Sequence, residues 1–104
     1  MFTWEKSNFR DKFGQIVETA EFEFLIDDPE YKIVNQEMVG NYLISTVWLG
    51  IAQGTFGNEY FETAIFDESN EMEQIDEIYR YHNINEAEEG HNLIVMKYKN
   101  VYED

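Results

Sequence analysis

The clearest pattern along the chain is a pair of apolar runs at residues 42–49 and 59–66. Both consist largely of β-branched and aromatic residues, which are typical of paired strands. A strand over 59–66 places residues 60, 62, 64 and 66 on one face of a sheet and residues 61, 63 and 65 on the other. The loop at 50–58 between the runs has three glycines, which permit positive φ at little cost.

Shorter elements are predicted on either side of this strand pair. Tyr31–Gln36 is predicted as a first strand, and Gly40-Asn41 marks the turn before the central run. Residues 67–77 are rich in acidic side chains and are predicted to form a surface loop. Ile78–His82 then follows as a short closing strand.

The most regular helical pattern is near the C-terminus. Asn85 is a favourable N-cap, and Glu88 completes a capping pair in which two free backbone N–H groups are satisfied. Lys97 and Lys99 fall near the end, where positive charge complements the helix dipole. The residues at helical spacing that are expected to face the sheet are Ala87, His91, Ile94, Val95 and Tyr98.

The segment at 18–26 fits two patterns. Phe22, Phe24 and Ile26 alternate as in a strand, whereas Phe22, Leu25 and Ile26 fit one face of a helix. The single proline, Pro29, lies in Asp-Asp-Pro-Glu and predicts that this segment stops and turns there.

Together the elements predict an α+β fold: an antiparallel meander of about four strands packed against a C-terminal helix, with a short N-terminal helix as a further element. A chain of 104 residues is long enough for one domain with a modest core. Residues 1–10 are expected to form an N-terminal arm and residues 99–104 a C-terminal tail. Aromatic residues near these ends are expected either to fold back over the open face of the sheet or to contact a partner, including a second copy of the chain. They are Phe2, Trp4, Phe9, Phe13, Tyr98 and Tyr102.

Charge is the second informative property. The chain has 22 acidic and 7 basic residues and a net charge of −15. This charge opposes binding to nucleic acids and anionic membranes and favours a basic partner, although solubility alone can also account for it. The chain has no cysteine, so it has neither disulfides nor thiolate metal sites, and it shows no signal peptide or membrane-spanning run. A soluble protein of the cytoplasm is expected.

Motifs for enzymatic chemistry are absent or generic. His82 and His91 lack a third metal ligand at matching spacing. Ser45 and Thr46 lack the Gly-x-Ser-x-Gly turn, and the glycines of 50–58 do not form a phosphate-binding sequence. The chain is therefore predicted to be non-enzymatic and to need no metal or cofactor.

Two groups of carboxylates allow other readings. The acidic residues of 67–77 could gather around a hard cation, but their spacing is not that of an EF-hand loop, which favours a solvated loop. Glu62 lies between large apolar residues in its strand. It needs a partner if its face is buried, and Arg80 is the candidate. An exposed role and a functional site for Glu62 stay open.

Residues 45–50 read Ser-Thr-Val-Trp-Leu-Gly, and residues 61–66 read Phe-Glu-Thr-Ala-Ile-Phe. This pair of runs resembles a family of small bacteriophage proteins of uncharacterised function, and the resemblance favours a helix at 18–26. Relatives commonly carry Asp-His or Asn-His where this chain has Ala52-Gln53, which argues against an inherited catalytic role. Further matches, over roughly residues 11–95, are Asp11 to Gly14, Tyr31 to Val34, Arg80-Tyr81, Glu86-Ala87 and Gly90-His91.

The leading hypothesis is a phage accessory protein that binds a basic host protein through an acidic surface. Its specific form is a nucleic-acid mimic that inhibits a bacterial defence nuclease. The residues expected to carry binding are Glu68, Glu71, Glu73, Asp76, Glu77, Glu86, Glu88 and Glu89.

Two alternatives remain from the sequence. The first is a small-molecule-binding protein or weak hydrolase, with a pocket rimmed by the 50–58 loop. Its pocket residues would be Trp48, Phe56, Glu62 and Arg80. The second is a structural subunit of a homo-oligomer.

Overall fold

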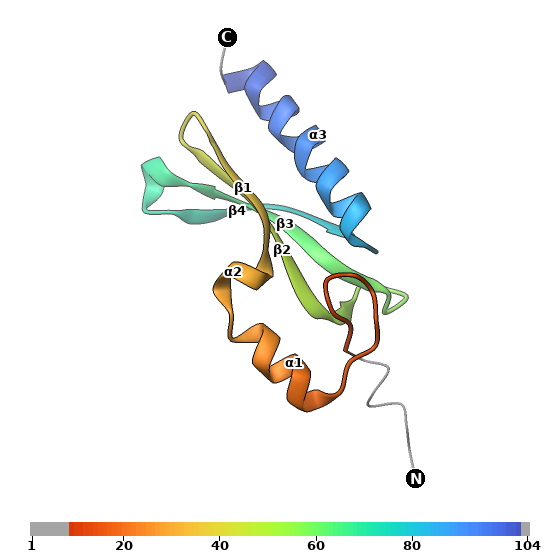
Figure 1. Ribbon diagram of the computed structural model, residues 1–104. Coiled ribbons are helices and arrows are strands. Elements are labelled where there is room, and N and C mark those ends of the chain that lie inside the picture. The colour runs from red at the N-terminus through yellow and green to blue at the C-terminus, as the bar shows by residue number, and fades with distance from the viewer. Residues whose placement is uncertain (1–8, 103–104) are drawn as a thin grey trace.

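The computed structural model describes residues 9–102 and confirms the α+β fold. Four antiparallel strands pair in chain order. The C-terminal helix α3, Ile84–Tyr102, contacts all four of them (Figure 1). The strands are β1 (Ile33–Val39), β2 (Tyr42–Gln53), β3 (Glu59–Asp67) and β4 (Glu73–Tyr81). The shorter elements are the helices α1 (Thr19–Ile26) and α2 (Pro29–Lys32) and the 3-10 turn η2 (Glu68–Asn70).

The N-terminal segment forms the predicted helix rather than a strand. α1 ends at Ile26, and α2 then begins at Pro29, where the proline's missing N–H has no cost in the first turn. The Asp28 carboxylate caps α2 by accepting from the backbone N–H groups of Glu30 and Tyr31. Because α2 includes Tyr31 and Lys32, the first strand begins at Ile33 and not at Tyr31 as the sequence suggested.

The acidic stretch after β3 is not a loop. η2 is followed by a turn in which Glu71 and Met72 have positive φ, and β4 starts at Glu73. The closing strand is therefore longer than the predicted Ile78–His82. Strand formation is favoured because Ile75 and Tyr79, which lie four residues apart and so on the same face of a strand, pack against the core.

The start of α3 also differs from the prediction. Asn83 is the capping residue, because its side-chain oxygen accepts from the Glu86 N–H at 2.9 Å. The capping pair is thus Asn83 and Glu86, two residues before the predicted Asn85 and Glu88, and the dipeptide at Ile84 and Asn85 is already helical. At the other end the helix includes residues 99–102, which were expected to be tail.

The core lies between the sheet and α3 and has three rows. Strand register pairs Ile44 with Ile65, Thr46 with Thr63, and Trp48 with Phe61. The first pair packs with Ile94, Val95 and Tyr98 of α3, and the last pair with Ala87. The row between them is polar and meets His91. All five residues predicted on the inner face of α3 are buried.

The aromatic residues near the ends have different positions. The Phe9 ring stacks on Phe22 with centroids 4.4 Å apart, so it folds back onto the core, as Tyr98 does. Phe13 is 74% exposed on a turn. Phe2 and Trp4 lie outside the described residues.

Candidate binding surface

The predicted acidic residues do not form one site. Glu68, Glu71 and Glu73 are exposed at the turn between β3 and β4. Glu86, Glu88 and Glu89 are at the start of α3, beyond the other end of β4. At about 3.3 Å per residue, the length of β4 puts roughly 26 Å between the two groups. Two separate acidic patches result.

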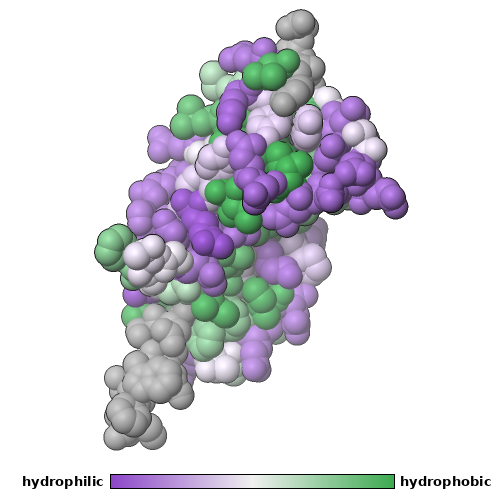
Figure 2. Space-filling view, turned by 180° about the vertical axis from the view of Figure 1, so that it is seen from behind, coloured by the Kyte–Doolittle hydropathy of each residue, from purple (hydrophilic) through white to green (hydrophobic). Residues whose placement is uncertain are grey.

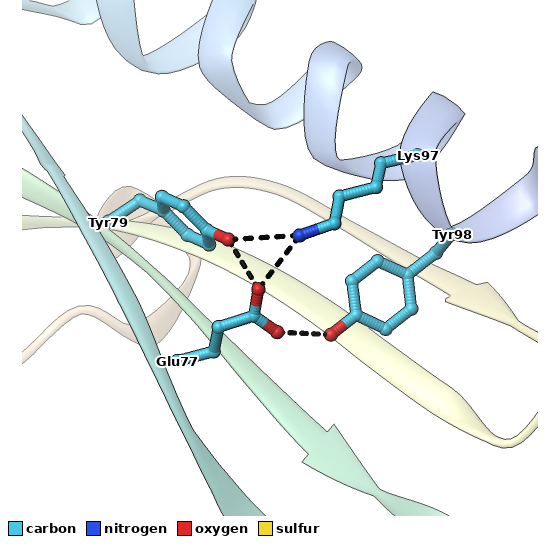
Figure 3. A network of polar contacts seen from close by, with 4 residues as sticks. All are labelled: Glu77, Tyr79, Lys97 and Tyr98. Carbon is cyan, nitrogen blue, oxygen red and sulfur yellow. Dashed lines mark hydrogen bonds and ion pairs between the residues drawn. The ribbon is translucent and has the colours of Figure 1, made fainter. Parts of the chain in front are cut away.

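Glu77 has a structural role. Its carboxylate accepts hydrogen bonds from the Tyr79 hydroxyl at 2.5 Å, the Tyr98 hydroxyl at 2.6 Å and the Lys97 ammonium at 3.0 Å (Figure 3). These bonds lower the pKa of Glu77 to about 2, and the bond from Tyr79 is the largest cause. The hydrogen bond between Lys97 and Glu77 raises the pKa of Lys97. The network ties β4 to α3, so Glu77 is engaged inside the molecule.

Replacing Glu77 by Gln should therefore make stability less dependent on pH. A carboxyl with a pKa of about 2 in the fold, below its ordinary value, stabilises the fold above pH 4.5 and loses that effect as the pH falls toward 2. We expect Glu77→Gln to lower the free energy of unfolding by about 1–2 kcal/mol at pH 7. The loss is no larger because solvent screens the charge of a partly exposed carboxylate. Urea titrations between pH 7 and pH 2.5 should show the gap to the native chain closing below about pH 4.5.

The matched control is Glu89→Gln, which changes an exposed carboxylate on the same helix as Lys97. Its stability should parallel that of the native chain over the same range. A gap for Glu77→Gln that stayed constant from pH 7 to pH 2.5 would contradict the assignment.

Glu86 is also engaged locally. Its carboxylate accepts from the backbone N–H of His82 and contacts the His82 ring at 3.0 Å, which closes the turn into α3. The backbone bond is the largest cause that lowers the pKa of Glu86. His82 thus closes the turn between β4 and α3. Of the eight predicted binding carboxylates, Glu77 and Glu86 stabilise the fold.

One acidic segment whose carboxylates are all exposed was not predicted from the sequence to take part in binding. Residues 18–30 contain six carboxylates and no basic residue. They are Glu18, Glu21, Glu23, Asp27, Asp28 and Glu30, and all are exposed on or beside α1 and α2. The sequence signal for this segment is its run of negative charge.

An apolar groove of about 360 Å³ lies beside this acidic segment, where β1 begins and α2 packs against β2. A shallower depression lined by Phe24, Asp27 and Asp28 adjoins it, with Pro29 lining both. Phe24 is 78% exposed. The residues lining the groove are Ile26, Pro29, Lys32, Ile33, Val47, Trp48 and Leu49.

The residues of the predicted alternative pocket are not gathered together. Trp48 is buried against Phe22, Tyr31 and α3, and Phe56 is almost fully exposed at the tip of the β2–β3 turn. Glu62 and Arg80 face each other across β3 and β4 on the other side of the sheet, joined at 3.2 Å. The predicted ion pair between Glu62 and Arg80 is present, but the groove is at α2 and not at the 50–58 loop.

The polar residues of the core are bonded to one another. Thr46, Thr63 and His91 are buried and bonded to one another. Within residues 9–102, no three His, Asp or Glu side chains are grouped as metal ligands. None of the helices in the same residues has the length and apolar character of a membrane-spanning helix.

Comparison with protein-family models, with curated proteins and with solved structures finds no match for the chain. The site must therefore be interpreted from its own geometry and charge.

Proposed function

We propose that this chain is a non-enzymatic binding protein that engages a basic site on a partner protein through its acidic surface. The observation that carries the proposal is the exposed acidic segment 18–30 beside an apolar groove. Interfaces combine an apolar centre with a polar rim, and this pairing of features supplies both. The patch at the turn between β3 and β4 has carboxylates without such a groove, so its role is to attract the partner over distance.

Four basic residues contact neighbours within the chain rather than one another. Arg80 pairs with Glu62 and Lys97 with Glu77. The Lys12 ammonium donates to the Ile33 carbonyl at 3.0 Å, and Arg10 lies over the Tyr60 ring. These four cations are held by neighbours inside the chain, while most carboxylates face solvent. Hydrophilic residues accordingly dominate the surface in Figure 2, with hydrophobic patches among them.

The resemblance of residues 45–50 and 61–66 to phage proteins supports a bacterial host protein as the partner. The specific form of the proposal is mimicry of nucleic acid, in which carboxylates take the place of phosphates in a basic cleft. A mimic competes with its model, so duplex DNA added at constant ionic strength should release the captured host protein. Retention of that protein in excess DNA would exclude mimicry while leaving acidic-surface binding in place.

Charge reversal in two patches tests the proposal. One variant replaces Glu21, Glu23 and Glu30 by Lys, and the other replaces Glu68, Glu71 and Glu73 by Lys. Because each change adds two positive units, both variants move the net charge from −15 by the same amount. We expect the first variant to lose a host protein that the native chain captures at low salt and releases at high salt. The second should retain it with slower association.

The comparison is decisive because net charge is matched. Equal loss in both variants would show that only total charge matters. Capture that is insensitive to salt and to both reversals would overturn the proposed function. Circular dichroism of each variant verifies that the fold is intact.

A further inference from the structure

The sheet has a second face that α3 does not cover. Along β2, residues 44, 46 and 48 point toward α3 and are at most 1% exposed. The alternate residues Leu43, Val47 and Leu49 are only half-buried. Gln36 and Ser45 bond to each other on this open face at 2.9 Å. An apolar strip lies around that pair: Met38 of β1, Leu43, Val47 and Leu49 of β2, Phe66 of β3 and Ile78 of β4.

The apolar strip leads directly into the groove. Val47 and Leu49 belong to both, and Ile33, paired with Val47, extends the groove lining onto β1. From Leu43 to Leu49 the strip is about 20 Å long, from the strand rise of about 3.3 Å per residue. A helix of about 13 residues has the same length. The groove at one end can hold a large apolar side chain of such a helix.

Negative charge borders this surface. Asp27 and Asp28 lie at the rim of the groove, Lys32 is the one basic residue among those that line it, and Asp76 is exposed on the open face of β4. Arg80, on the same face, is paired with Glu62. A surface with an apolar centre and acidic borders complements a partner segment that has an apolar stripe with basic residues on either side. A second copy of the chain would bring another −15 charges to the same face, so self-association is opposed.

We propose that the apolar strip and the groove bind an amphipathic helix of the partner protein, with an apolar stripe and Lys or Arg on its flanks. The inference rests on the proposed function and names the docking site and the form of the partner. The bound helix covers the open face as α3 covers the other, and the sheet becomes the middle of three layers. Its apolar residues recur at i, i+3, i+4 and i+7, as in other helix-in-groove complexes.

Three labelled peptides of about 14 residues, a length that spans the apolar strip, test the proposal with the full chain by fluorescence anisotropy. The first contains Leu at helical spacing and Lys elsewhere. The second has the same composition in an order that breaks the helical spacing, and the third has Glu in place of Lys. We expect the first to bind at least roughly tenfold more tightly than the second, and the third not to bind.

Variants locate the binding surface. Ile78→Gln changes a residue that is 46% exposed, so the fold tolerates it, and Leu49→Gln changes the groove. Each should weaken binding of the first peptide by roughly tenfold. The control is Leu93→Gln, which changes a leucine that is 65% exposed on α3, and affinity should then change less than about twofold.

The failures of the two proposals are distinguishable. Equal binding of both Leu/Lys peptides would overturn the docking site and leave acidic-surface binding standing. Absence of binding by both would count against the proposed function as well. In NMR spectra of the chain with the first peptide, changes in amide chemical shift confined to the turn between β3 and β4 would also overturn the docking site. So would sedimentation that shows a dimer which Ile78→Gln dissociates. Shift changes along residues 43–49 would support it.

Discussion

Replacing Gly50 by Ala should lower the free energy of unfolding by about 3 kcal/mol. Gly50 is buried at the end of the Ser-Thr-Val-Trp-Leu-Gly run and has a φ of +77°. A Cβ there would lie 2.5 Å from ring carbons of both Phe22 and Trp48. The left-handed backbone costs a non-glycine residue about 1–2 kcal/mol, and displacing packed rings costs about 1–3 kcal/mol more. Urea denaturation at pH 7, followed by circular dichroism, measures the loss.

Gly57→Ala is the matched control. Gly57 also has positive φ, at +64°, but a Cβ there would meet no atom within 4 Å. Its loss should be about 1 kcal/mol, which is the backbone contribution alone. The difference between the two variants then measures the packing of Gly50 against the two rings. Equal losses would contradict the close approach at Gly50.

The helix and the central strands were predictable because their patterns are local. Ala87, His91 and Ile94 repeat with the helical period, and all three face the sheet. The pairing of Glu62 with Arg80 was expected for a buried face, whereas both residues lie on the open face, where strand register sets them opposite each other. For the helix and the central strands, nearby residues carry the information.

The sequence predicts a surface loop for residues 73–77, whose strand pattern is incomplete, but these residues belong to β4. Its inward positions include Ile75 and Tyr79, but Glu77 lies between them and breaks the apolar pattern. That carboxylate is acceptable on the inner side because Lys97 and Tyr98, about 20 residues away in the chain, join Tyr79 in supplying its hydrogen bonds. No local pattern contains Lys97 and Tyr98, so the segment has the sequence features of a solvated loop.

The groove could not be predicted for a similar reason. It forms because α2 occupies Pro29–Lys32, so that β1 begins only at Ile33. Val47 and Leu49 of β2 therefore face Pro29 and Ile26. Each residue is an ordinary apolar residue in the sequence. Only the packing of a four-residue helix against the strand makes a concave surface of them.

The polar row in the core also depends on distant residues. Tyr81 lies 3.0 Å from Thr63, Thr63 lies 2.5 Å from Thr46, and Thr46 lies 2.8 Å from Nδ1 of His91. Nε2 of His91 lies 3.3 Å from the Glu37 carboxylate. A carboxylate only accepts, so His91 donates from Nε2, and in the neutral imidazole with that tautomer Nδ1 accepts. Each hydroxyl then donates its one proton to the next group in the row: Tyr81 to Thr63, Thr63 to Thr46, and Thr46 to His91. Burial is the largest cause that raises the pKa of Tyr81, so its hydroxyl stays protonated.

Replacing Thr46 by Val should therefore destabilise the fold by about 3 kcal/mol. Valine has nearly the same shape but no hydroxyl, so Nδ1 of the fully buried His91 loses its donor and Thr63 loses its acceptor. The control is Ser45→Ala, which removes a bond to exposed Gln36 from the opposite face and should cost less than about 1 kcal/mol. Urea denaturation at pH 7 compares the two. Losses equal within about 0.5 kcal/mol would show that the buried row does not stabilise the core, because an unsatisfied buried acceptor costs more than an exposed one.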